Sequence, residues 1–109
     1  MGTLTYGDSG SVISFDDRAL MHLQIVICTK LRRRENFMFS WTDAAAVSNG
    51  RSAIWLDPAS TLYFRYFGSR VPTSNREWIE TLMRSANSPG GLVYVTEPPP
   101  QPARERPPG

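Results

Sequence analysis

The densest group of side chains that could do chemistry is the run from Lys30 to Arg34, which holds four cations in five residues. Guanidinium groups bind phosphates and carboxylates through paired hydrogen bonds, and every cation of this chain except Lys30 is an arginine. Three further arginines are expected near the ends of helices or strands. The residues predicted to form a basic rim for nucleic acid or an acidic protein are Lys30, Arg32, Arg33, Arg34, Arg51, Arg70 and Arg76.

A structural role is the alternative explanation of the same run. It falls where a helix is expected to end, and cations stabilise the carbonyl-rich end of a helix by about 0.3 to 1 kcal/mol each. The net charge of +2 gives only a weak overall field and does not by itself identify a polyanion partner.

Aromatic residues beside an arginine are a second feature that suits nucleic acid. Tyr63 and Phe67 flank Arg65, and their rings could stack on bases if they are exposed. The tryptophans are a different case, because large aromatic side chains in a small domain belong more often to the core. At least two of the three tryptophans are therefore expected inside.

Candidate catalytic residues are few. His22, the only histidine, could act as a general base, but no nucleophile motif accompanies it, so a solvent-facing or partly buried structural role is favoured. Cys28 is expected to fill the core, while Asp16 and Asp17 are expected to cap a helix. The signatures of zinc proteases, calcium-binding loops and nucleotide-binding loops are missing. The sequence thus favours a non-enzymatic protein and predicts no cofactor and no metal site.

The composition bounds the organisation of the chain. A length of 109 residues with 40% hydrophobic and 20% charged residues is typical of one folded domain. A single cysteine excludes an intramolecular disulfide and suits a reducing compartment. No signal peptide and no membrane span is expected, so we predict cytoplasmic residence and no membrane partner.

Hydrophobic spacing predicts the helices and strands. A hairpin around the turn Gly7 to Gly10 comes first, and the spacing of apolar residues then predicts a helix over about 17–33. Turns at Asn49-Gly50 and Asp57-Pro58 separate three central strands, which are expected to form an antiparallel meander, with the aromatic residues of the first facing inward. A capping box at Ser74 begins the second helix, and a final strand follows near residue 92.

These elements predict an α+β fold in the order ββαβββαβ, with two helices packed on one face of a mostly antiparallel sheet. The domain is expected to span residues 1–97. Six of the last twelve residues are prolines, so residues 98–109 are expected to form a disordered tail with polyproline II character.

Several short blocks carry a resemblance to a known family. They are Gly2 to Gly7, Phe15 to Arg18, Lys30 to Arg33, Gly68 to Arg70, Asn75 to Trp78 and Ala86 to Gly91. Over residues 1 to about 97 the chain resembles a family of short actinobacterial proteins, which implies an actinobacterial or actinophage source. Proteins of that family often carry the label ATP-dependent DNA ligase.

The ligase label can be tested against the residues. The label would imply an adenylated lysine in a Lys-x-Asp-Gly motif, whereas the only lysine here precedes Leu31-Arg32-Arg33. Autonomous ligation is therefore not expected. The leading hypothesis is a binding or accessory module that contacts nucleic acid or an acidic protein. The alternatives are a structural or self-associating protein, which could form a homo-oligomer through an aromatic sheet face or an edge, and a ligase-associated accessory protein.

Overall fold

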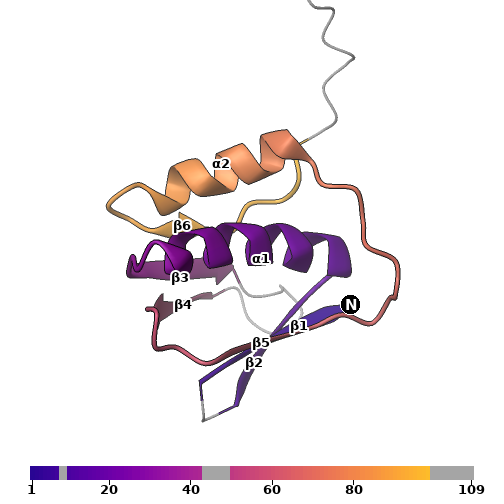
Figure 1. Cartoon of the computed structure of the whole chain (residues 1–109), viewed down its shortest axis with the longest axis horizontal. Coiled ribbons are helices and arrows are strands. Elements are labelled where there is room, and N and C mark those ends of the chain that lie inside the picture. The colour runs from indigo at the N-terminus through magenta and orange to yellow at the C-terminus, as the bar shows by residue number, and fades with distance from the viewer. Residues whose placement is uncertain (8–9, 43–49, 99–109) are drawn as a thin grey trace, which may run out of the picture.

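The computed structural model describes residues 1–7, 10–42 and 50–98, and its elements follow the predicted order ββαβββαβ (Figure 1). The elements are β1 (Gly2–Tyr6), β2 (Ser11–Phe15), α1 (Asp17–Arg32), β3 (Phe37–Thr42), β4 (Arg51–Leu56), β5 (Leu62–Arg65), α2 (Arg76–Ala86) and β6 (Leu92–Val93). The α+β class is confirmed. Parts of two predicted turns, at residues 8–9 and 49, and the predicted tail beyond Pro98 lie outside the described residues.

The strands form two three-stranded sheets instead of one. Sheet A has the order β2-β1-β5 and is antiparallel throughout, whereas sheet B has the order β4-β3-β6, with β3 and β6 parallel. The predicted meander is therefore wrong at its third strand, because β5 pairs with β1 and not with β4. In that register Leu4 lies opposite Phe64, so both strands turn the same face to the core.

The turn after β4 explains the change of sheet. The Asp57 carboxylate accepts a hydrogen bond from the Ala59 N–H, and the Ser60 N–H donates to the Asp57 carbonyl. This closed turn leads the chain away from β4 and into sheet A. The Tyr6 hydroxyl donates to the Trp55 carbonyl at 2.6 Å, which ties the end of β1 to β4.

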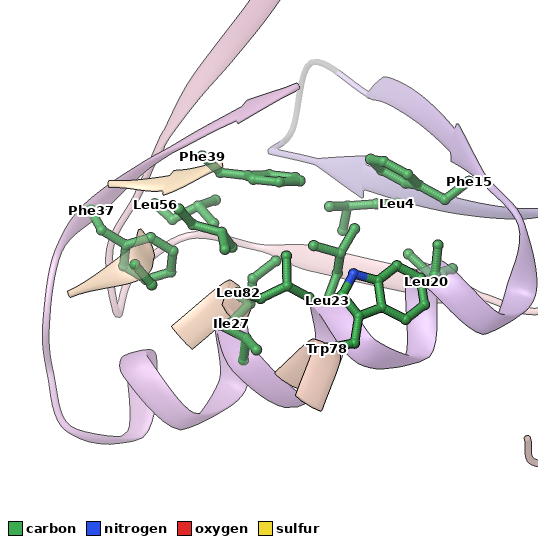
Figure 2. Close-up of a cluster of buried hydrophobic side chains, with 14 residues drawn as sticks. Leu4, Phe15, Leu20, Leu23, Ile27, Phe37, Phe39, Leu56, Trp78 and Leu82 are labelled. Atoms are coloured by element: carbon green, nitrogen blue, oxygen red, sulfur yellow. The ribbon is translucent and has the colours of Figure 1, made fainter. Parts of the chain in front are cut away.

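The core lies between the helices and the inner faces of both sheets. Figure 2 shows labelled side chains of the strands facing those of the helices across one apolar layer. The fully buried large apolar residues are Leu4, Leu20, Leu23, Val26, Ile27, Phe39, Leu56, Leu82 and Leu92. Trp78 is also buried, Trp41 packs half-buried against the core, and Trp55 is exposed.

Local capping sets where the helices begin. Asp16 caps α1 as predicted, because its carboxylate accepts from the Ala19 N–H at 2.6 Å. The cap of α2 is Asn75 and not Ser74, so the predicted capping box is wrong by one residue. The Asn75 side-chain oxygen accepts from the Glu77 and Trp78 N–H groups.

Candidate functional site

The seven predicted cationic residues do not gather on one rim. The two helices lie side by side and run parallel, since Asn75 at the start of α2 contacts α1 at His22, and Asn87 after α2 contacts Lys30 near the end of α1 (Figure 1). Arg32, Arg33 and Arg34, which we call the arginine triad, lie exposed at the C-terminal end of this helix pair.

The other predicted arginines lie elsewhere. Arg76 begins α2, and Arg70 follows Gly68, whose N–H binds Asp17 at the start of α1. The helix α1, which is sixteen residues and about 24 Å long, lies between this end and the triad. Arg51 begins β4 opposite Thr42, at the far end of the β3–β4 pair from Phe37. Sequence reasoning omitted Arg84, which is exposed in the last turn of α2 at the same end as the triad.

Lys30 is a structural cation and not part of an exposed rim. Its side chain is only 6% exposed, and its ammonium donates to the Asn87 side chain at 2.7 Å and pairs with Glu35. It also lies 5.9 Å from the centre of the Phe37 ring. The hydrogen bond from Lys30 lowers the pKa of the Glu35 carboxyl. Glu35, which follows the triad, is thus paired with Lys30, and the charge of Arg33 contributes to its lowered pKa.

Arg34 holds a backbone conformation that favours glycine. Its φ is +60°, its N–H donates to the Leu31 carbonyl at 2.9 Å, and the Glu35 N–H donates to the Lys30 carbonyl at 3.2 Å. These two bonds form a Schellman motif, in which the left-handed position is usually glycine. An arginine here destabilises the helix end by about 1 kcal/mol relative to glycine.

His22 is fully buried, which corrects the predicted solvent-facing or partly buried position. Its Nε2 accepts from the Asn75 N–H at 2.8 Å, and Nδ1 lies 2.7 Å from the Arg18 carbonyl. Because Nε2 accepts, the hydrogen belongs on Nδ1, which donates to Arg18. The ring packs 4.5 Å from that of Trp78. Both nitrogens are thus occupied in fixing α2 against α1, which leaves no free base.

Glu97 anchors the C-terminal segment to both helices. Its carboxylate accepts from Arg18 at 2.7 and 2.8 Å and from the Asn75 side chain at 2.8 Å. The bonds from Arg18, and then from Asn75, lower the pKa of Glu97 to about 2. Trp78 donates from its indole to the Val95 carbonyl at 2.9 Å. Sequence reasoning missed this network, because its partners lie up to 79 residues apart.

Acid should weaken this anchor. Because the pKa of folded Glu97 lies below its ordinary value of 4.5, the unfolded chain binds the proton more readily, and its contribution to stability is lost as pH falls from about 4.5 towards about 2. We expect Glu97→Gln to be less stable than the wild type near neutrality and to lose less stability on acidification. Urea unfolding of both proteins from about pH 6 to about pH 3 measures these two effects. The prediction would be contradicted if the free energies of unfolding of the wild type and the variant fell in parallel with pH.

Two exposed surfaces carry large apolar side chains. Tyr63 on β5 of sheet A and Phe67 just beyond the end of that strand are 59% and 64% exposed, and the Arg65 guanidinium lies 5.9 Å from the centre of the Phe67 ring. On sheet B, Trp55 is 48% exposed and lies opposite Met38 in the β3–β4 register. The first surface has the exposure that base stacking requires. The exposure of Trp55 is compatible with the prediction, which placed at least two of the three tryptophans inside.

No catalytic arrangement appears among the described residues. A cavity of about 700 Å³ lies between β2 and the β3–β4 pair. Among the described residues that line it, which include Tyr94, Asp16 is the only acid. Cys28 is half-buried, not fully in the core, and burial raises the pKa of its thiol. Within residues 1–7, 10–42 and 50–98, no group of acidic, histidine or cysteine side chains could hold a metal ion. None of the helices there is long and apolar enough to span a membrane.

The comparisons with known proteins give one match. The search of curated proteins and the search of solved structures both returned no match. Residues 1–97 match a family whose description is "Domain of unknown function" (DUF7882), and Glu97, which Arg18 holds, is the last residue of that match. Because the match covers most of the 109 residues, this chain belongs to the DUF7882 family.

Proposed function

We propose that this protein is a non-enzymatic binding module whose arginine triad contacts nucleic acid or an acidic protein. One observation carries the proposal: Arg32, Arg33 and Arg34 are consecutive and exposed, while the adjacent Glu35 is held by Lys30. No ion pair with the triad occurs among the described residues. Three guanidinium groups at one helix end could therefore contact phosphates or carboxylates.

The conformation of Arg34 supports the same proposal. Helix ends of this kind are stabilised by glycine at the left-handed position, yet the chain keeps a cation there. Local departures from the most stable residue are concentrated at functional sites. A binding role would explain why arginine occupies a position that it destabilises.

The binding test compares two variants with the same change of charge. In the first, Arg32, Arg33 and Arg34 are replaced by glutamate; in the second, Arg51, Arg70 and Arg76 are. Fluorescence anisotropy with a labelled single-stranded oligonucleotide and with an acidic peptide should show at least a tenfold loss of affinity for the first variant, and a smaller loss for the second. Equal losses would contradict a site localised at the helix end, and an unbound wild type would contradict the function.

Arg34→Gly separates binding from stability. This single substitution should raise the free energy of unfolding by about 1 kcal/mol, because glycine adopts the positive φ without strain. It should at the same time weaken binding to whichever partner the wild type binds. Arg33→Gly is the matched control, since Arg33 has a negative φ of −86° and should gain no stability.

Enzymatic function receives no support from the position of Lys30. An amine that is buried and bound to Asn87 and Glu35 is not presented to a nucleotide. The proposal of an accessory role beside a ligase would therefore depend on binding and not on lysine chemistry. The domain that binds is proposed to span residues 1–97 and to reside in the cytoplasm, where a single unpaired cysteine is stable.

Self-association is the second candidate function. Trp55 and Met38 lie opposite each other on the outer face of sheet B, and Val93 is exposed on β6 of the same sheet. Such an apolar group could bury itself against a second copy of the chain. Light scattering over a range of concentrations distinguishes this role, since a dimer that Trp55→Ser dissociates would support it and a constant monomer would exclude it.

A further inference from the structure

The outer face of sheet A carries a regular row of aromatic and cationic side chains. Tyr63 and Arg65 alternate on β5 with the half-buried Leu62 and Phe64. Phe67 lies two residues beyond the end of the strand, where the alternation of exposed and half-buried side chains continues. Side chains two residues apart on a strand are separated by about 7 Å. We call Tyr63, Arg65 and Phe67 the aromatic row.

Core packing does not account for these aromatic rings. The inward side chains of the same segment, Leu62, Phe64 and Tyr66, already pack against the core. Tyr63 and Phe67 instead expose more than half of their surface to water. Large exposed rings that pack against little are a feature of binding surfaces.

The neighbours of the row favour a nucleic acid over an apolar protein. In the register of sheet A, Thr5 lies opposite Tyr63 and Thr3 lies opposite Arg65, while Val12 and Ser14 of β2 complete the two cross-strand rows. These six positions hold one cation, four hydroxyl groups and no carboxylate. The carboxylate beside the row is that of Asp17, which accepts from the backbone N–H groups of Phe67 and Gly68. A cation and hydroxyl groups beside exposed aromatic rings are complementary to phosphates and bases, and less so to an apolar protein surface.

The backbone beside Phe67 is fixed. The Asp17 carboxylate accepts from the N–H groups of Phe67 and Gly68, at 3.3 and 2.7 Å. The Gly68 bond is the main cause of the lowered pKa of Asp17. Phe67 is thereby held in place just beyond the end of β5, with the Arg65 guanidinium near its ring. Because the backbone is already fixed, less conformational freedom is lost there when a base stacks on the Phe67 ring.

We propose that the aromatic row binds single-stranded nucleic acid by stacking bases on Tyr63 and Phe67, with Arg65 contacting the intervening phosphate. This inference rests on the proposed function and specifies its partner. Bases of a duplex are stacked on each other and present only their edges in the grooves, so the row should discriminate against double strands. The arginine triad, by contrast, would contact phosphates of either form.

The test uses three labelled probes of about 15 nucleotides: a single strand of thymidylate, a duplex, and a single strand whose central nucleotides lack bases. Tyr63→Ala and Phe67→Ala should each weaken binding of the complete single strand about tenfold, because one stacked base contributes about 1 to 3 kcal/mol. Both variants should bind the duplex and the baseless strand as the wild type does. Tyr63→Phe keeps the ring and should retain affinity.

The outcomes separate this inference from the proposed function. Ile25→Ala, which removes an exposed apolar side chain from α1, is the control and should leave binding of all probes unchanged. If the aromatic variants bind the complete strand normally while charge reversal of the triad abolishes binding, the aromatic row is overturned and the triad remains. If the aromatic variants bind the complete strand weakly but charge reversal of the triad leaves binding unchanged, the aromatic row is supported and the triad is not. Equal affinity of the wild type for complete and baseless strands would also overturn the row.

Discussion

Gly91→Ala is expected to lower the free energy of unfolding by about 3 kcal/mol. Gly91 precedes β6 with a φ of +82°, which strains any residue with a Cβ. A Cβ at this position would also lie 2.5 Å from the Met38 carbonyl oxygen on β3. To relieve this clash, β6 would have to move away from β3, and the parallel pairing of these two strands would be weakened.

The neighbouring glycine gives a matched control for this effect. At Gly90 an added Cβ would meet only the Ser88 hydroxyl, at 3.9 Å, and no positive φ opposes the substitution. Gly90→Ala should therefore change stability by less than about 1 kcal/mol. Urea unfolding of both variants measures the difference, and equal stabilities for the two would show that β6 is not held as described.

Trp78→Ala is expected to cost about 3 to 5 kcal/mol of stability. The indole is 2% exposed, packs against the His22 ring at 4.5 Å, and donates to the Val95 carbonyl at 2.9 Å. Its loss would leave a cavity between α1 and α2 and an unsatisfied carbonyl in the C-terminal segment. Trp78→Phe restores a ring without the donor and should recover part of the loss.

Trp55→Ala serves as the comparison because the same residue type is removed from a 48% exposed position. The stability of this variant should fall by less than about 1.5 kcal/mol, because Trp55 buries far less apolar surface on folding than Trp78 does. The difference in urea midpoint between Trp78→Ala and Trp55→Ala tests which tryptophan belongs to the core. A larger loss at Trp55 would contradict the packing in Figure 2.

The helices and the order of elements were predictable because they depend on local spacing. The stripe Leu20, Leu23 and Ile27 identified α1 even though several β-branched residues interrupt it, and all three are buried. The same holds for Trp78 and Leu82 on α2. Amphipathic periodicity survives in a sequence without any knowledge of the partner that buries it.

The pairing of β5 was not predictable in the same way. A meander and the observed β1–β5 pairing use the same alternation of side chains in Leu62 to Arg65, so periodicity cannot distinguish them. The choice depends on the turn at Asp57 and on contacts with β1 nearly sixty residues earlier. Long-range strand pairing is information that a single sequence carries only weakly.

The candidate site was predictable in composition but not in geometry. The exposure of Arg32, Arg33 and Arg34 follows from their place at a helix end, whereas the burial of Lys30 depends on Asn87, far along the chain. His22 was misplaced for a similar reason, because its partner Asn75 lies 53 residues away. Polar residues are buried when distant partners satisfy them, and a local pattern does not reveal those partners.

The central claim is that the arginine triad binds a polyanion, and the salt dependence of binding tests it most directly. For a single-stranded oligonucleotide, the logarithm of the association constant should fall linearly with the logarithm of salt concentration, with a slope of roughly −0.7 for each phosphate contacted. Replacing Arg32, Arg33 and Arg34 with glutamine should make that slope shallower by about 2. An unchanged slope in the triple variant, or a wild-type affinity independent of salt, would contradict the claim.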